Sequence, residues 1–206
     1  MHPNPAFRGV ETARNICFAR DRGFGILAVS GDGVPLMSHV PFLLSEDGAV
    51  ADLHLVRSNP ILRLLKDPVA ARLAVSGPDG YVSPDWYEIA DQVPTWNYVA
   101  VHLTGTLEAR PQSELRTLLD RQSAFSEARL LPKPPWTAEK MSVDALARMM
   151  RMIVPCRMRV QMIDGTWKLN QNKPDEVRLR ASDRIATDGF GTETQALSAL
   201  MRDAKE

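Results

Sequence analysis

Three short segments carry side chains that could bind a ligand with a phosphate group and a flat ring. The first consists of Arg57, Ser58 and Asn59. It directly precedes Pro60, an order typical of the start of a short helix. A helix N-terminus offers free N–H donors and a partial positive charge, which suit a phosphate. Helix capping alone would also explain Ser58 and Asn59, and only the adjacent Arg57 favours a phosphate site.

The second segment consists of Thr95, Trp96 and Asn97. It lies within residues 77–105, which hold two of the four Trp and all three Tyr of a chain that is only 6% aromatic. Aromatic rings beside prolines give a large apolar surface on a backbone of fixed φ, so the surface is stiff before anything binds. This pattern is equally compatible with a ligand platform and with a loop that closes a barrel end or forms a dimer interface.

The third segment contains Lys168, Gln171 and Asn172. Together with Trp167 and Asn170 it places an amine, three amides and an indole along a stretch expected to be extended. Amide and indole N–H groups suit the carbonyl and ring-nitrogen edges of a flat heterocycle. Surface polarity near a turn is the alternative explanation.

The histidines do not have the spacing of a metal site. They stand at positions 2, 39, 54 and 102, without an HxxxH motif and without a nearby cysteine. His39 and His54 both lie on predicted strands and could point into the same cavity. A structural role for each is the alternative.

Several enzyme classes lack their sequence signatures in this chain. There is no GxSxG elbow, no Walker loop and no GxGxxG motif. Hydrolase, NTPase and Rossmann dehydrogenase functions are therefore not indicated. Glu46 and Asp47 form a carboxylate pair, but they lie in a predicted turn, where solvation explains them.

The composition is that of an ordinary globular protein. Lys+Arg and Asp+Glu both total 25, so there is no bulk charge that would attract nucleic acid. Cys17 and Cys156 are far apart, which favours reduced thiols and a cytoplasmic location. Neither a signal peptide nor a membrane span is predicted.

Apolar periodicity predicts six antiparallel strands and several helices. The expected strands cover about residues 24–30, 34–44, 49–56, 69–76, 97–107 and 156–163, with a turn at 164–165 into 167–169. The expected helices cover about 10–20, 60–66, 113–125, 142–153, 175–186 and 192–205. Without βαβ alternation, this order favours an α+β protein built on a small barrel with helices at its edges.

Taken together, the segments resemble the PaiB family of FMN-binding negative transcriptional regulators, a branch of the split-barrel flavoproteins that includes pyridoxamine phosphate oxidase. The resemblance rests on YVSPxWY from Tyr81, VPTWNY from Val93 and a late KLxQN motif from Lys168, and it covers nearly the whole chain. The family usually has serine where this chain has Asn170.

The resemblance implies a six-stranded antiparallel split β-barrel with peripheral helices, forming a homodimer with FMN at the subunit interface. The FMN phosphate would face residues 57–59, and its ring or ribityl chain would face His39, Val40 and His54. Residues 95–97 would complete the site with Lys168, Gln171 and Asn172, from the same subunit or its partner. Residues 1–172 would form the FMN-binding domain, and 173–206 a helical extension packed on it.

Two classes of function follow from these observations. The first is a flavin-dependent regulator or reductase of unknown substrate, in which the cofactor carries the hydride chemistry and no catalytic acid or base needs to be visible. The second is a transcriptional repressor that binds DNA directly, which the neutral charge disfavours. Haem in place of flavin is a further alternative, with His39, His54 or His102 as an axial ligand.

Overall fold

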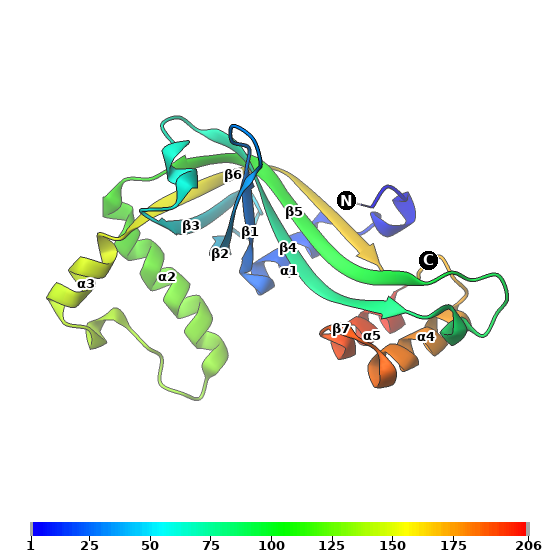
Figure 1. Cartoon of the computed structure of the whole chain (residues 1–206). Coiled ribbons are helices and arrows are strands. Elements are labelled where there is room, and N and C mark those ends of the chain that lie inside the picture. Colours follow the sequence, from blue (N-terminus) through cyan, green and yellow to red (C-terminus); the bar gives the residue numbers. More distant parts are fainter. Residues whose placement is uncertain (1, 205–206) are drawn as a thin grey trace. The chain divides into compact units, whose positions relative to one another are not determined.

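The structure is a computed structural model that describes residues 2–204. Its contacts divide into two units: residues 16–74 with 103–163, called the barrel unit here, and residues 1–15, 75–102 and 164–206, called the helical unit. Three long strands, β4 (Val69–Val82), β5 (Thr95–Ala109) and β6 (Ile153–Lys168), contribute residues to both units (Figure 1).

The barrel unit is a closed six-stranded antiparallel barrel. Its remaining strands are β1 (Phe24–Val29), β2 (Leu36–Leu44) and β3 (Val50–Val56). The strand order is β1-β2-β3-β6-β5-β4, and β1 pairs again with β4 from Ile26↔Ala74 to Val29↔Ala71, which closes the sheet. The predicted α+β class and split barrel are therefore confirmed.

Alternating side chains fill the barrel. In β2, Val40 and Phe42 are buried whereas Met37 and His39 are exposed, as expected for a strand with one face in the core. Five strands contribute further large buried core residues: Leu27, Leu53, Leu55, Leu73, Leu103, Leu107 and Met158.

Two helices belong to the barrel unit alone, α2 (Leu115–Glu127) and α3 (Val143–Met150). Ser142 accepts a hydrogen bond from the Ala145 amide at 3.4 Å and caps α3, as its position predicted. α1 (Thr12–Arg22) ends at Gly23, whose φ of +58° explains the glycine at this helix end.

The helical unit contains α4 (Asp175–Asp188), α5 (Thr194–Asp203) and the short strand β7 (Gly191–Thr192), which pairs with β4. The Ser182 hydroxyl donates to the Ser198 carbonyl at 2.9 Å, so the two helices share a buried polar contact. The division into residues 1–172 and 173–206 stays a prediction.

Three sequence-based boundaries were wrong. Asp164-Gly165 is not a turn, because β6 continues to Lys168. The loop expected directly after Gly77 begins later, because β4 continues to Val82. The helix expected over 60–66 is only a 3-10 helix, Pro60–Arg63.

Candidate functional site

The phosphate segment follows β3 in the barrel unit. Asn59 begins the 3-10 helix: its Oδ1 accepts from the Ile61 amide at 3.0 Å, and its Nδ2 donates to Ser38 Oγ at 3.1 Å. A four-residue 3-10 helix has little macrodipole, so a phosphate site at this helix start would depend mainly on side-chain donors, and the site stays a prediction. The donors that remain are the exposed side chains of Arg57 and Ser58.

Arg57 is held by the segments beside α2 and α3. Its Nε donates to the Arg151 carbonyl at 2.8 Å and its Nη2 to Gln112 Oε1 at 3.3 Å. Its backbone amide donates to the Met152 carbonyl at 2.7 Å. The guanidinium is thus oriented by the fold, and it keeps N–H groups for a ligand.

His39 and His54 both lie on the outer face of the barrel. His39 is exposed, and its ring stacks on Phe24 with centroids 6.4 Å apart. His54 is half-buried, its Nδ1 lies 3.0 Å from Gln122 Oε1 of α2, and burial lowers the pKa of its imidazole. The Val40 side chain is only 3% exposed and belongs to the core, so Val40 can offer a ligand only its backbone.

In the helical unit, two of the predicted segments meet directly. The Lys168 ammonium donates to Thr95 Oγ1, and it lies 5.8 Å from the centroid of the Phe7 ring. Burial lowers the pKa of Lys168, and among the described residues no carboxylate forms an ion pair with it. A half-buried ammonium without a counterion costs stability, which is typical of a group kept for an anionic or electron-rich ligand.

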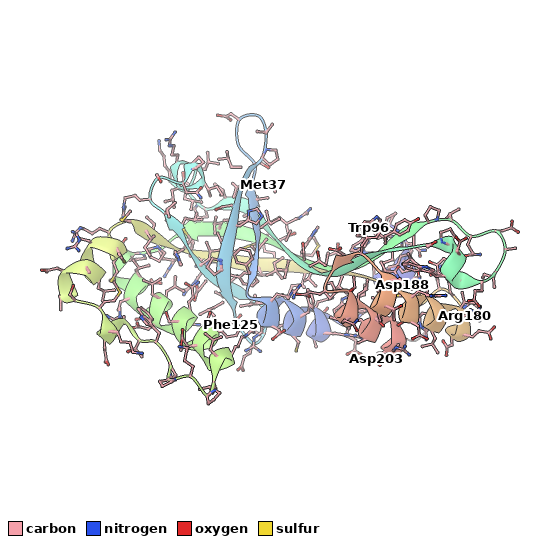
Figure 2. The ribbon with its side chains drawn as sticks, turned by 60° about the horizontal axis from the view of Figure 1, so that its bottom comes forward. Met37, Trp96, Phe125, Arg180, Asp188 and Asp203 are labelled. Carbon is pink, nitrogen blue, oxygen red and sulfur yellow. The ribbon has the colours of Figure 1, made fainter. Side chains whose placement is uncertain are left out.

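Trp96 follows Thr95 in β5 and presents an aromatic surface. Its side chain is 44% exposed, and its ring lies edge-on to Tyr81 and to Phe190, with centroids 6.4 and 5.7 Å apart (Figure 2). The neighbouring Asn97 is fully buried. Its Nδ2 donates to Met201 Sδ at 3.4 Å, and its Oδ1 has no hydrogen bond in the described structure.

The late motif is not extended, because the chain turns after Lys168. Gln171 closes this turn: its Oε1 accepts from the Leu169 amide at 2.8 Å, and its Nε2 donates to the Trp167 carbonyl at 2.6 Å. Asn170 has a φ of +62°, and its buried side chain donates to the Tyr87 hydroxyl at 3.1 Å. Asn tolerates this left-handed backbone better than most residues, which explains its presence where the family has serine. Asn172 is exposed.

Sequence reasoning missed three partners of the candidate residues. Gln122 orients His54, Ser38 binds Asn59, and Phe190 packs against Trp96. Each contact joins residues from different elements, and nothing in the local pattern of Gln122 or Phe190 marks it. The structure brings residues 95 and 168 together, and it places residues 39, 54 and 57–59 in the barrel unit.

The closed six-stranded antiparallel barrel places the protein in the split-barrel fold class. The model of the family described as "Putative FMN-binding domain" matches residues 1–162. The chain belongs to this family, and FMN is its cofactor. The predicted PaiB-type split barrel that binds FMN is thereby confirmed.

Two relatives have similar sequences. The chain is 26% identical over 206 residues to "Protease synthase and sporulation protein PAI 2" of Bacillus subtilis, covering 97% of this chain and 96% of that protein. It is also 26% identical over 205 residues to an uncharacterised protein of Aspergillus fumigatus, covering 75% of this chain and 78% of the relative.

Solved structures share the fold at low sequence identity. A FAD and heme binding protein from Mycobacterium smegmatis superposes with a TM-score of 0.57 at 17% identity, covering 90% of this chain and 82% of its own. The flavocytochrome Anf3 from Azotobacter vinelandii gives 0.55 at 14% identity, covering 93% and 80%. At these identities the likeness concerns the fold alone.

The residues present fit FMN by their chemistry. Arg57 and Ser58 supply the charged and hydroxyl donors that a phosphate needs. Lys168 supplies an ammonium without a counterion, and Trp96 an exposed ring. The described residues contain no group of three or more His, Cys, Asp or Glu side chains that could hold a metal ion. No helix within residues 2–204 is long and apolar enough to span a membrane.

Proposed function

We propose that this protein is a homodimeric, cytoplasmic, FMN-dependent regulator or reductase that binds its cofactor between two subunits. The observation that carries the proposal is Lys168, a half-buried ammonium with a lowered pKa and no carboxylate partner in the described structure. Lys173 is likewise half-buried without a carboxylate partner among the described residues, but its ammonium lies 4.2 Å from the centroid of the Tyr87 ring, whereas that of Lys168 lies 5.8 Å from the centroid of the Phe7 ring. A ligand that accepts hydrogen bonds would compensate for the burial of Lys168.

Each segment has a role in this proposal. Arg57 and Ser58 of one subunit bind the phosphate, with Asn59 fixing the turn that presents them. His39, His54 and the backbone of Val40 lie along the ring and ribityl chain. From the partner subunit, Lys168, Thr95 and Asn172 supply donors and Trp96 an aromatic face. Asn97 and Gln171 are positioning residues, because Asn97 is fully buried and Gln171 is bonded within its own turn.

The outer face of the barrel supports the homodimer. Phe24, Met37 and Val56 come from three neighbouring strands, and each side chain is more than half exposed. Apolar side chains gathered on one sheet face favour burial against a second protein surface. His39 shares this outer face, so a second copy that covers it also lies next to proposed FMN contacts.

When bound, FMN supplies hydride transfer, and the chain supplies binding, orientation and charge. The Lys168 ammonium places a positive charge and N–H donors beside Thr95. The His54 imidazole stays neutral near pH 7 because burial lowers its pKa, so it can accept or donate a hydrogen bond without adding charge. The Arg57 guanidinium offers N–H donors that can hold a phosphate.

An absorption spectrum and a titration with FMN test the proposal. The protein as purified should show the two flavin bands, or it should bind added FMN at one per subunit with micromolar or tighter affinity. Its mass in solution should be that of a dimer. A Soret band would instead assign haem, and colourless monomeric protein that ignores FMN would refute the proposal.

Direct DNA binding is the second candidate function, and one surface favours it. Lys140, Arg148 and Arg151 are exposed on and beside α3. Three phosphate contacts would give log K a slope of about −3 against log salt concentration. A gel-shift series at rising salt measures this slope, and the absence of a shift at low salt would exclude direct DNA binding.

A further inference from the structure

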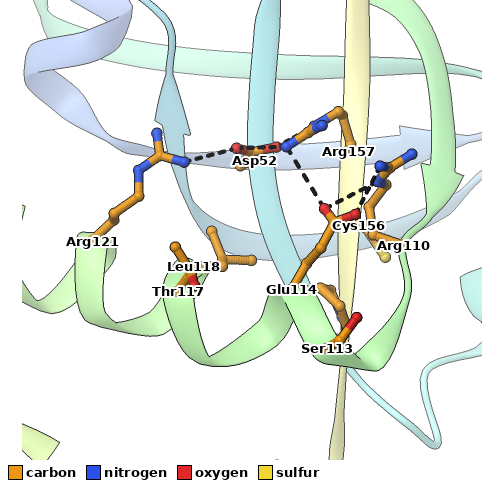
Figure 3. A pocket seen from close by; sticks show the side chains of 10 residues that line it. Asp52, Arg110, Ser113, Glu114, Thr117, Leu118, Arg121, Cys156 and Arg157 are labelled. Carbon is orange, nitrogen blue, oxygen red and sulfur yellow. Dashed lines mark hydrogen bonds and ion pairs between the residues drawn. The ribbon is translucent and has the colours of Figure 1, made fainter.

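A cavity of about 230 Å³ lies in the barrel unit between α2 and the strands β3 and β6. Guanidinium groups of Arg110, Arg121 and Arg157 and carboxylates of Asp52 and Glu114 line it (Figure 3). None of the lining residues belongs to the proposed flavin site. The cavity is a separate place where a ligand could bind.

Asp52 is the buried centre of this cluster. Its Oδ1 accepts from Arg157 Nε at 2.7 Å, and its Oδ2 accepts from Arg157 Nη2 and Arg121 Nη1, both at 3.2 Å. Asp52 and Arg157 are paired across β3 and β6, whereas Arg121 reaches in from α2. The ion pairs therefore hold α2 against the barrel and fix the cavity's shape.

The network carries an unbalanced positive charge. Arg110 pairs with Glu114 at 2.8 Å and with Glu108 at 3.0 Å, and Arg159 pairs with Glu108 at 3.5 Å. Together with the Asp52 pairs, this makes four guanidinium groups against three carboxylates. Arg121 is the least committed of the three cations that line the cavity. Its side chain is 57% exposed, and it gives only Nη1 to Asp52 among the described residues.

The rest of the cavity wall combines hydroxyls with apolar groups. Ser113 lies in the 3-10 helix Gln112–Glu114 and Thr117 in the first turn of α2, and both line the cavity. Leu118, Pro155 and Cys156 are buried and form the apolar part. Burial raises the pKa of the Cys156 thiol to about 12, so the sulfur stays protonated and serves as an apolar wall rather than as a nucleophile.

We propose that this cavity binds a small monocarboxylate with a short alkyl chain. One negative charge neutralises the network, and the Arg121 guanidinium and the Thr117 hydroxyl, four residues apart on α2, offer donors to a carboxylate. The alkyl chain would lie against Leu118 and Pro155. The volume is below the range of about 300–1,000 Å³ typical of sites for drug-sized ligands, so the ligand is a metabolite of few atoms.

Calorimetric titration of the FMN-saturated protein with butyrate tests this proposal. Arg121→Gln should weaken butyrate binding about tenfold, because it removes a charge-assisted hydrogen bond at a partly exposed site. Thr117→Val should weaken it about threefold through one neutral hydrogen bond. Arg116→Gln is the matched control: Arg116 lies on the same helix and pairs with Asp120, and this change should leave butyrate affinity unchanged.

Two further ligands test whether the carboxylate, the alkyl chain or negative charge alone accounts for the affinity. Butan-1-ol has the alkyl chain without the carboxylate and should bind at least about tenfold more weakly than butyrate. Inorganic phosphate should also bind more weakly, because its second charge is not neutralised. The proposal is overturned if Arg121→Gln binds butyrate like the wild type, if butanol or phosphate binds as tightly, or if butyrate displaces FMN and raises free flavin fluorescence.

Discussion

Replacing Lys168 by Met tests whether this lysine binds a ligand or only stabilises the fold. The Lys168 ammonium is half-buried, donates to Thr95 Oγ1 and has no carboxylate partner among the described residues. If it binds FMN, Lys168→Met removes one charge-assisted hydrogen bond of about 1.5–3 kcal/mol. FMN affinity should then fall by about one to two orders of magnitude.

The stability of the FMN-free protein should respond differently. Lys168→Met removes a buried charge along with one hydrogen bond, so the free energy of unfolding should change by less than about 1 kcal/mol. Because burial lowers the folded pKa below 10.5, the wild-type protein should gain stability as pH rises from that folded pKa to 10.5. Lys168→Met should not show this rise in stability with pH. Denaturant unfolding at several pH values measures both quantities.

Lys173 provides the matched control. Burial also lowers its pKa, but its ammonium lies 4.2 Å from the centroid of the Tyr87 ring and donates to Gln92 Oε1. Lys173→Met should cost about 0.5–1 kcal/mol of stability and leave FMN affinity unchanged. If Lys168→Met behaves in this way, losing stability and keeping FMN affinity, the reasoning about Lys168 is refuted.

Three further changes test the fold around the site. Burial lowers the folded pKa of His54, so the stability of the wild-type protein should fall as pH drops below about 6.5. His54→Asn should reduce this fall, which thermal unfolding at several pH values measures. Asp52→Asn should lower the free energy of unfolding in urea by about 2 kcal/mol, a value reduced because the arginine partners of Asp52 are partly exposed. A change below about 0.5 kcal/mol, as for an ordinary surface substitution, would contradict the role of Asp52 in holding α2. Gly105→Ala should cost about 3 kcal/mol, because its Cβ would meet the Arg159 carbonyl oxygen at 1.9 Å, whereas Gly9→Ala, with nothing within 4 Å, should be neutral.

The barrel was predictable because its strands alternate strictly. Val99, Val101 and Leu103 are all at most 1% exposed, as their spacing predicted. Glycines misled the prediction where they serve close packing. Gly165 lies inside β6 because a Cβ there would come within 2.1 Å of Asn15 Oδ1, so the glycine marks a close approach and not a turn.

The candidate site was predictable only in part. The capping role of Asn59 follows from its position before Pro60, but the length of the following helix depends on packing that local sequence does not encode. The contact of Lys168 with Thr95 joins residues far apart in the chain and was expected only through the family resemblance. The burial of Asn97 and the internal bonding of Gln171 depend on α5 and on the turn after β6, which no motif reveals.

A mixed-dimer titration tests most directly whether FMN is bound between two subunits. Arg57→Gln and Lys168→Met are prepared as separate homodimers, exchanged into heterodimers and titrated with FMN. If Arg57 of one subunit and Lys168 of its partner hold the same FMN, each heterodimer contains one intact site and one doubly altered site. Half of the sites should then regain wild-type affinity. If no site in the heterodimers regains wild-type FMN affinity, or if neither variant weakens FMN binding, the shared site is contradicted.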